Sequence, residues 1–228
     1  MTTPQAQRFG PAVDSTPALL PGPVTLTGRF GSVARLDARR HGPDLWDAVH
    51  GHDDIWHYLP VGPFADQSGF ASWLAERERS TSPYYLYTIL DAHGRALGIS
   101  ALMEFRLAMR VIEVGHITYG AALQRTPLAT EAQYLLARYA FETLGYRRYE
   151  WKCNSFNAPS RRAALRFGFT YEGIFRQHMI VKGRSRDTAW FSMLDGEWPA
   201  RKQAFERWLA PENFDRDGGQ KTSLAGFR

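Results

Sequence analysis

The loop at residues 124–130 carries the chemistry that can be inferred most directly from the sequence. It reads Gln-Arg-Thr-Pro-Leu-Ala-Thr and lies between a strand-like run, residues 111–119, and a run with helical spacing. A loop that enters a helix presents backbone N–H groups without intrahelical acceptors, together with the positive end of the helix dipole. Both features attract phosphate oxygens. We therefore expect this loop to bind the phosphate groups of a ligand.

The elements that position this loop follow from the spacing of apolar residues. Strands are predicted where these residues alternate or run together, at residues 24–36 (broken at Gly28 or Gly31), 84–90, 97–105, 111–119, 149–153, 169–171, 175–181 and 188–194. Helices are predicted where they recur at helical spacing, at residues 44–49, after a cap at Asp66 or Ser68, at 130–144, at 159–167 and after a cap at Asp195. Antiparallel strands come first and strand–helix–strand–helix follows, which indicates an α+β fold with a mixed, mostly antiparallel sheet.

Composition divides the chain into four parts. An arm at residues 1–22 is rich in proline and lacks periodicity, and a tail at residues 211–228 is polar and rich in glycine. We expect both segments to be flexible, because neither offers enough apolar surface to bury. Between them lie the domain proper at residues 23–195 and a C-terminal helix at residues 196–210.

The phosphate-binding loop opens a series of four motifs. Residues 124–129 fit the pattern Gln/Arg-x-x-Gly-x-Gly/Ala, apart from Pro127 at the central glycine. Three more motifs follow in order: Asn-x-x-Ser at 157–160, Phe-Gly-Phe at 167–169 and Glu-Gly at 172–173. This succession resembles the GCN5-related N-acetyltransferase (GNAT) superfamily, and within it the subgroup that acetylates the N-termini of ribosomal proteins. The resemblance extends, more loosely, over residues 24–194.

The resemblance implies a single-domain GNAT fold in which acetyl-CoA lies between two splayed parallel strands, here residues 111–119 and 149–153. The pyrophosphate would rest on the amides of the loop, from which Pro127 removes one donor. Asn157 would hold the pantetheine arm, with a plain helix cap as the alternative. Arg125, Arg161 or Arg162 can meet the outer phosphate or lie on the surface as ordinary charge. The residues implied at the cofactor are Ile117, Tyr119, Gln124, Arg125, Thr126, Leu128, Ala129, Thr130, Asn157, Ser160 and Arg162.

Two residues of the strand at 111–119 are candidate general bases for the implied reaction. Glu113 is the first choice and His116 the second; the alternatives are a solvated carboxylate and a structural histidine. Residues three apart in a regular strand face opposite sides. A bulge at Gly115, of a kind the family often has, would bring both side chains to the site.

The proton for the departing thiolate needs a donor. In much of the superfamily this is a tyrosine four residues before the glycine of Gly-Phe, a position that Ala164 occupies here. The pattern of the subgroup suggests Ser160, with a serine bonded to the backbone as the alternative. Cys153 is expected to be an inert residue of a buried strand. The acceptor pocket is expected to draw on an aromatic cluster, or else this cluster is core: Trp56, Tyr58, Phe64 and Trp73.

The acceptor is predicted from the protonation of amines. An N-terminal α-amine has a pKa of about 8, so roughly a tenth is neutral at pH 7, whereas a lysine amine is neutral only about once in several thousand. An α-amine therefore needs mainly positioning, and we predict the N-terminus of a protein or peptide. A small amine such as a polyamine, amino acid or drug is the close alternative. Pro127 and Ala164 also motivate a catalytically inactive CoA-binding module.

Composition limits the other classes of function. The chain has 228 residues, a formal net charge of +5 and one cysteine. Its basic residues form isolated pairs rather than a run, which argues against a nucleic-acid partner. No apolar run is long enough for a membrane helix, the N-terminus lacks the layout of a secretory signal, and the histidines show no zinc-ligand spacing. We expect a cytoplasmic protein without a metal; whether it forms a homodimer stays open.

Overall fold

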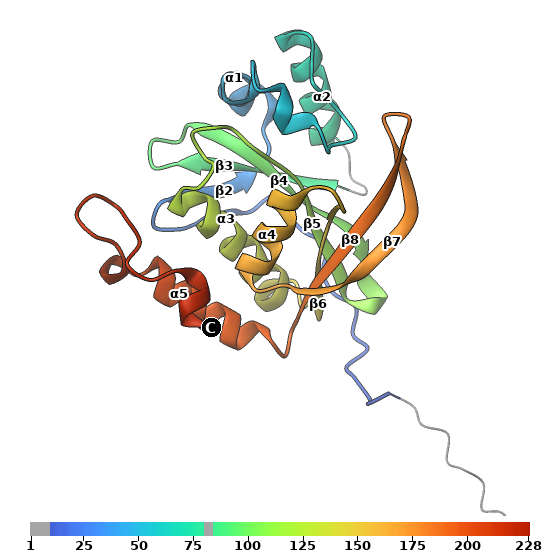
Figure 1. Cartoon of the computed structure of the whole chain (residues 1–228), viewed down its shortest axis with the longest axis vertical. Helices are drawn as coiled ribbons and strands as arrows, with labels where there is room; N and C mark the ends of the chain where they lie inside the picture. Colours follow the sequence, from blue (N-terminus) through green and yellow to red (C-terminus); the bar gives the residue numbers. More distant parts are fainter. Residues whose placement is uncertain (1–9, 80–83) are drawn as a thin grey trace, which may run out of the picture.

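The computed structural model describes residues 10–79 and 84–228 (Figure 1). It contains an eight-stranded sheet with the order β1-β2-β3-β4-β5-β6-β8-β7. In chain order the strands are β1 (Thr25–Thr27), β2 (Gly31–Arg35), β3 (Tyr84–Asp91), β4 (Ala96–Arg106), β5 (Val111–Tyr119), β6 (Arg148–Asn154), β7 (Thr170–Val181) and β8 (Arg184–Leu194). The α-helices are α1 (Ala38–Val49), α2 (Gln67–Arg79), α3 (Pro127–Arg138), α4 (Ala158–Phe167) and α5 (Trp198–Leu209).

Every neighbouring pair in the sheet is antiparallel except β5 and β6, which are parallel. Helices α1 and α2 pack on one face, in a cluster with Leu86 and Ile99. Helices α3, α4 and α5 pack on the other, in a larger cluster that includes Tyr149 and Met193. Figure 1 shows the two groups of helices apart from each other. The predicted α+β class and mixed, mostly antiparallel sheet are confirmed.

The parallel pair separates part-way along its length. Residues Val111 to Val114 of β5 pair with Arg148 to Trp151 of β6. Beyond Val114 and Trp151 the two strands continue, to Tyr119 and Asn154, without pairing to each other. The opening leaves a wedge in the sheet, as the resemblance implied.

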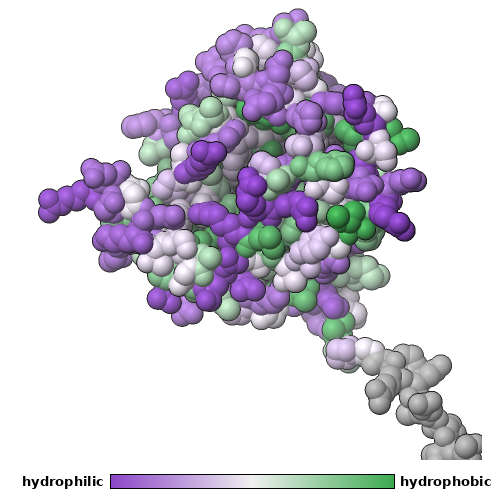
Figure 2. All heavy atoms as spheres, viewed as in Figure 1, coloured by the Kyte–Doolittle hydropathy of each residue, from purple (hydrophilic) through white to green (hydrophobic). Residues whose placement is uncertain are grey.

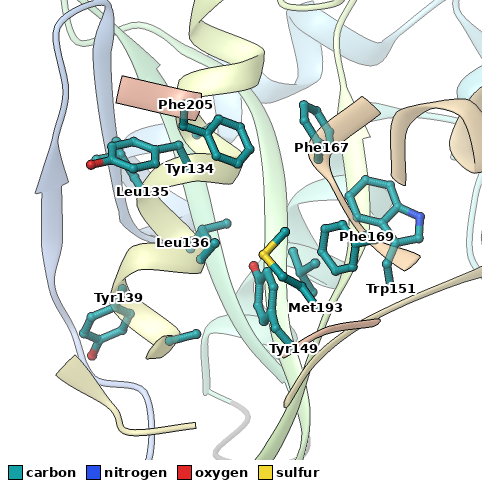
Figure 3. Packing of buried hydrophobic residues seen from close by; sticks show 14 of the residues in the cluster. Tyr134, Leu135, Leu136, Tyr139, Tyr149, Trp151, Phe167, Phe169, Met193 and Phe205 are labelled. Atoms are coloured by element: carbon teal, nitrogen blue, oxygen red, sulfur yellow. The ribbon is translucent and has the colours of Figure 1, made fainter. Parts of the chain in front are cut away.

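Aromatic packing fixes the first half of β6 against the C-terminal end of α4 and the residues that follow it (Figure 3). Tyr149 stacks on Phe169 with ring centroids 5.6 Å apart, and Trp151 packs against Phe167 at 5.9 Å. Such aromatic pairs add about 0.5–1.5 kcal/mol to the free energy gained by burying their area. Strand β6, which borders the wedge, is therefore held rigidly from the face that α3, α4 and α5 cover.

Two helices begin earlier than their apolar spacing predicts. Helix α1 starts at Ala38 rather than near residue 44, because Asp37 caps it by accepting a hydrogen bond of 2.8 Å from the Arg40 amide. Helix α3 starts at Pro127 rather than Thr130; proline suits the first helical position, where an N–H has no acceptor.

Two predictions in the C-terminal half of the chain need correction. The predicted cap at Asp195 is wrong: α5 begins three residues later, at Trp198, and the Asp195 carboxylate accepts from the Gly196 amide instead. The strands predicted at 169–171 and 175–181 form one strand, β7, with a bulge between Phe175 and Met179. Its outer surface keeps apolar side chains exposed, including Phe175 and Ile180. In Figure 2 this side of the molecule shows apolar residues among mostly hydrophilic ones.

The segments expected to be flexible are in part packed. In the tail, Leu224 is buried, and the Phe214 ring meets that of Trp208 in α5 edge-on at 5.3 Å. In the arm, Ala18 is buried and its amide donates to the Leu107 carbonyl. A few apolar residues suffice here because α5 and the sheet supply the rest of the apolar surface. Residues 1–9 of the arm lie outside the described residues.

Candidate active site

A cavity of about 660 Å³ occupies the wedge between β5 and β6. Its walls come from both strands, the N-terminal turn of α4, the loop around residue 58 and the β7–β8 hairpin. Among the residues singled out from the sequence, the cavity is lined by Tyr58, Glu113, His116, Ile117, Cys153, Asn157 and Ser160. Segments more than a hundred residues apart in the chain thus meet at this wedge.

Glu113 lies in the wall on the face of the sheet that α1 and α2 cover. It stands opposite Met103 of β4, and its side chain is 8% exposed. Lys152 Nζ on β6 lies 2.9 Å from Glu113 Oε2 and 3.0 Å from Glu150 Oε2. Burial raises the pKa of Glu113 to about 7, although Lys152 acts in the opposite direction. A carboxyl group with this pKa is half ionised near neutral pH, which suits a general base.

A β-bulge in β5 places His116 in the same cavity. Gly115 pairs with Ala101 and Thr118 with Ile99, so β5 has one more residue than β4 over this stretch. The extra residue is accommodated at His116, whose φ is +49°. The bulge lies beside Gly115, where the family resemblance led us to expect one. It interrupts the strand alternation and lets two residues three apart line one cavity.

The imidazole of His116 is packed rather than hydrogen-bonded. Its ring stacks on Trp73 of α2, with centroids 5.3 Å apart. Burial lowers its pKa to about 4, so the ring is neutral near pH 7. Its Nε2 atom is buried and has no hydrogen-bond partner among the described residues.

The N-terminal turn of α4 forms the other side of the cavity. Asn157 caps the helix: its Oδ1 accepts from the Ser160 amide at 3.1 Å. The Ser160 hydroxyl oxygen accepts from Trp151 Nε1 at 3.0 Å, and its proton can be donated to a further acceptor. Burial raises the pKa of the neighbouring Cys153 thiol, as expected for an unreactive cysteine.

In the loop before α3, some of the hydrogen-bond donors are already bonded within the described part of the chain, and others are not. Thr126 caps the helix, because its Oγ1 accepts from the Ala129 amide at 3.2 Å, and its own amide donates to the Leu123 carbonyl. Gln124 Nε2 donates to the Tyr119 carbonyl. Within the described residues, the amides of Arg125 and Leu128 have no acceptor. These two amides are therefore available to bind an anion at this end of the loop.

Residues 35–170, more than half of the chain, match the acetyltransferase (GNAT) domain family. The chain belongs to the GNAT acetyltransferase family. A GCN5-related N-acetyltransferase from Brucella melitensis is 48% identical over 93% of this chain and 97% of its own, with a TM-score of 0.90. A GNAT-family structure from Chromobacterium violaceum ATCC 12472 is 44% identical over 87% of this chain and 100% of its own, with a TM-score of 0.79.

A more distant structure shares the fold. It is the ribosomal-protein-S5-alanine acetyltransferase from Vibrio fischeri, which is 14% identical over 77% of this chain and 98% of its own, with a TM-score of 0.61. No curated protein matches the chain.

The GNAT family uses acetyl-CoA as cosubstrate, and the wedge of this GNAT acetyltransferase fits it. The unpaired stretches of β5 and β6 leave room for an extended chain, and the N-terminus of α3 offers free amides to its phosphates. Ser160 and Glu113 both line the cavity in this wedge. The observation supporting the fit is the pair of free amides at Arg125 and Leu128.

Several residues implied at the cofactor have their side chains occupied elsewhere. The Tyr119 hydroxyl accepts from Gln133, and the Thr130 hydroxyl accepts from Arg166 at 2.9 Å. Arg162 is exposed on α4.

The predicted aromatic acceptor pocket is mostly core. Trp56 is 2% exposed and packs edge-on against Phe64 and Trp73, with centroids 5.3 and 6.3 Å away. It does not line the cavity, so its place in the pocket is corrected; Tyr58, two residues on, does line it. The spacing of aromatic residues in the sequence does not distinguish a face that is buried in the core from one that lines a solvent-exposed pocket.

Further residues of this GNAT acetyltransferase that the sequence did not single out line the cavity, among them Lys152, Arg186 and Trp190. A signal for two of them exists in β8, where Arg186, Thr188 and Trp190 alternate with Asp187, Ala189 and Phe191. Among the described residues we find no group of three or more potential metal ligands. In the same part of the chain, no helix has both the length and the apolar character needed to span a bilayer.

Proposed function

We propose that this GNAT acetyltransferase transfers the acetyl group of acetyl-CoA directly to a primary α-amine, as at the N-terminus of a peptide or protein. The observation that carries the proposal is Glu113, a buried carboxyl group in the wall of the wedge with a pKa of about 7. Such a base suits an α-amine, whose pKa of about 8 lies close to its own. The Asn-x-x-Ser and Glu-Gly motifs, which resemble the subgroup acting on ribosomal-protein N-termini, support a peptide acceptor.

Acetyl-CoA would be held from the face of the sheet that α3, α4 and α5 cover. The amides of Arg125 and Leu128 would bind its phosphates, and Asn157 would donate its side-chain N–H to the pantetheine arm while its Oδ1 stays in the helix cap. The backbone of Ile117 in the unpaired stretch of β5 would lie along the same arm. When bound, the cosubstrate supplies the activated acetyl group.

Two proton movements are assigned to this chain. The Glu113 carboxylate takes a proton from the acceptor ammonium, directly or through one water, and so leaves the amine free to attack. The Ser160 hydroxyl donates a proton toward the sulfur of the departing thiolate. Neutral His116 stays uncharged beside the acceptor and, through its free Nε2, offers it a hydrogen-bonding atom.

The substitution Glu113→Gln tests the assignment, because it keeps the shape of the side chain and removes the base. We expect kcat for an N-terminal peptide to fall by about a hundredfold or more while the Kd for acetyl-CoA changes little. Mass spectrometry of acetylated peptides and titration calorimetry with acetyl-CoA measure the two quantities. Glu212→Gln, at an exposed position outside the cavity, is the control.

The proposal fails in two distinguishable ways. Unchanged turnover in Glu113→Gln would remove this residue as the base. Binding of acetyl-CoA by the wild-type protein, with no transfer to peptides or to small amines, would identify a non-catalytic CoA-binding module instead.

A further inference from the structure

Arg186 is a cavity residue that the proposed mechanism does not use. It lies on β8, and strand alternation puts its side chain on the same face as Thr188 and Trp190. Trp190 stands directly opposite Lys152 of β6, whose Nζ lies 4.0 Å from the centre of the indole ring. Arg186 therefore lies on the side of the sheet that carries Glu113 and Lys152, away from α3 and α4.

Within residues 10–79 and 84–228, the guanidinium of Arg186 has no counter-ion. Among the described residues, no carboxylate lies within salt-bridge distance of Arg186, and its Nε is buried without an acceptor. By contrast, Arg106 on β4 and Arg148 on β6 both pair with Glu150. Burial lowers the pKa of Arg186, which reflects the cost of desolvating an unpaired cation.

The two residues that follow Arg186 on the same face of β8 are held by contacts across the hairpin. Thr188 Oγ1 is 3.0 Å from His178 Nδ1, and the Trp190 ring stacks on Phe175 with centroids 4.5 Å apart. These contacts join the two strands of the hairpin beside Arg186. A planar guanidinium with unused N–H groups is suited to binding a carboxylate through two parallel hydrogen bonds.

The cavity thus presents two opposite charges to an acceptor. Glu113 attracts the ammonium group that is to be deprotonated, and Arg186 is left to attract an anion. Glu113 acts on Arg186 only at longer range: no salt bridge joins the two residues, and the Glu113 carboxylate pairs with Lys152 at 2.9 Å. An amine that also carries a negative group would match both.

We propose that Arg186 binds a carboxylate of the amine acceptor, so that the preferred substrate carries an amine and a carboxylate together. This inference rests on the proposed acetyl transfer to an α-amine. The carboxylate can be that of a free amino acid or that of an acidic side chain near a peptide N-terminus. Arg186 is then a residue that determines specificity, while Glu113 performs the proton transfer.

The test compares acceptors that differ only in one charge. The first pair is phenylalanine and phenylalaninamide, and the second is the amidated peptides Ala-Glu-Ala and Ala-Gln-Ala. Rates are compared at equal concentrations of neutral amine, since the amide and the acid differ in amine pKa. For the wild type we expect kcat/KM to favour the acidic member of at least one pair by about ten- to a hundredfold, the range of a charge-assisted hydrogen bond. The pair that shows the preference identifies the source of the carboxylate.

The variant Arg186→Gln should abolish this preference, mainly through KM, and Arg186→Lys should restore part of it. Arg184→Gln, two residues away on the same strand and exposed, should behave as the wild type. The Kd for acetyl-CoA should stay unchanged in all three variants.

Three results would overturn the inference. They are an acid-to-neutral ratio that survives in Arg186→Gln, a wild type that shows no preference in either pair, and a loss of acetyl-CoA affinity in Arg186→Gln, which would make Arg186 a cofactor residue. If the wild type acetylates none of the four amines, the proposed function fails, and the inference fails with it.

Discussion

Replacing Lys152 with methionine should move the pH dependence of the reaction upward. The Lys152 ammonium lies 2.9 Å from the Glu113 carboxylate and favours its ionised form. At this distance and an effective dielectric constant of about 20, two unit charges attract by about 6 kcal/mol. Lys152 divides this attraction between Glu113 and Glu150, so only part of it is expressed at Glu113. Because one pKa unit corresponds to about 1.4 kcal/mol, we expect a rise of at least about one unit above the wild-type value.

The assay is the pH profile of kcat/KM for an α-amine acceptor, which reports groups of the free enzyme and the free substrate. Activity is lost as the pH falls through the pKa of Glu113, because the base must be ionised. In the wild type this limb should therefore lie near pH 7, and in Lys152→Met near pH 8 or above. Titration of the acceptor amine contributes equally to both profiles, so the difference between them isolates Glu113.

Lys202→Met is the matched control, since Lys202 pairs with Glu142 at 2.9 Å, outside the cavity. Its profile should coincide with that of the wild type. An acidic limb that stays in place or moves down in Lys152→Met would refute the reasoning.

Three other predictions concern the cofactor loop, the helix cap and the tail. Pro127→Gly should lower the Kd for acetyl-CoA, because it returns an amide donor to the loop, and calorimetry that shows equal or weaker binding would argue against this role of the loop. Asn157→Ala should weaken acetyl-CoA binding and lower the free energy of unfolding by about 1 kcal/mol through loss of the α4 cap, with Asn157→Asp as the variant that keeps the cap but not the donor. Leu224→Ala should cost about 2–5 kcal/mol in denaturant unfolding, whereas a neutral result would mean that the tail does not pack as described.

Local patterns in the sequence were enough to predict the helices α3 and α4 and the strands beside them. Their apolar residues recur with a regular period, and their ends carry caps and glycines that act on neighbouring residues. The bulge in β5 was expected only from the family resemblance. Nothing in the residues around His116 requires it, because it depends on the register with β4.

The charged residues of the cavity were harder to predict because they meet only through the sheet. Lys152 follows Glu113 by 39 positions, and Arg186 follows Lys152 by 34; their proximity depends on the strand order β5-β6-β8. Trp56 was misplaced for the opposite reason, since a local cluster of aromatic residues is consistent with both core and pocket. The tail was misjudged because its few apolar residues pack on surfaces of α4 and α5 that lie elsewhere in the chain.

The β7–β8 hairpin separates two requirements that an acetyltransferase must meet, the choice of acceptor and the transfer of the acetyl group. The ladder between β6 and β8 ends at Asn154 and Thr188, followed by one hydrogen bond from the Ser155 amide to the Asp187 carbonyl; beyond it the two strands of the hairpin pair with each other. It lies outside the stretch matched to the family, which ends at residue 170. Residues can be added to or removed from its tip in equal numbers on both strands without disturbing the strands that open around the cosubstrate. The hairpin is therefore an exchangeable module, through which related enzymes or a protein engineer can alter the choice of acceptor while the transfer chemistry stays the same.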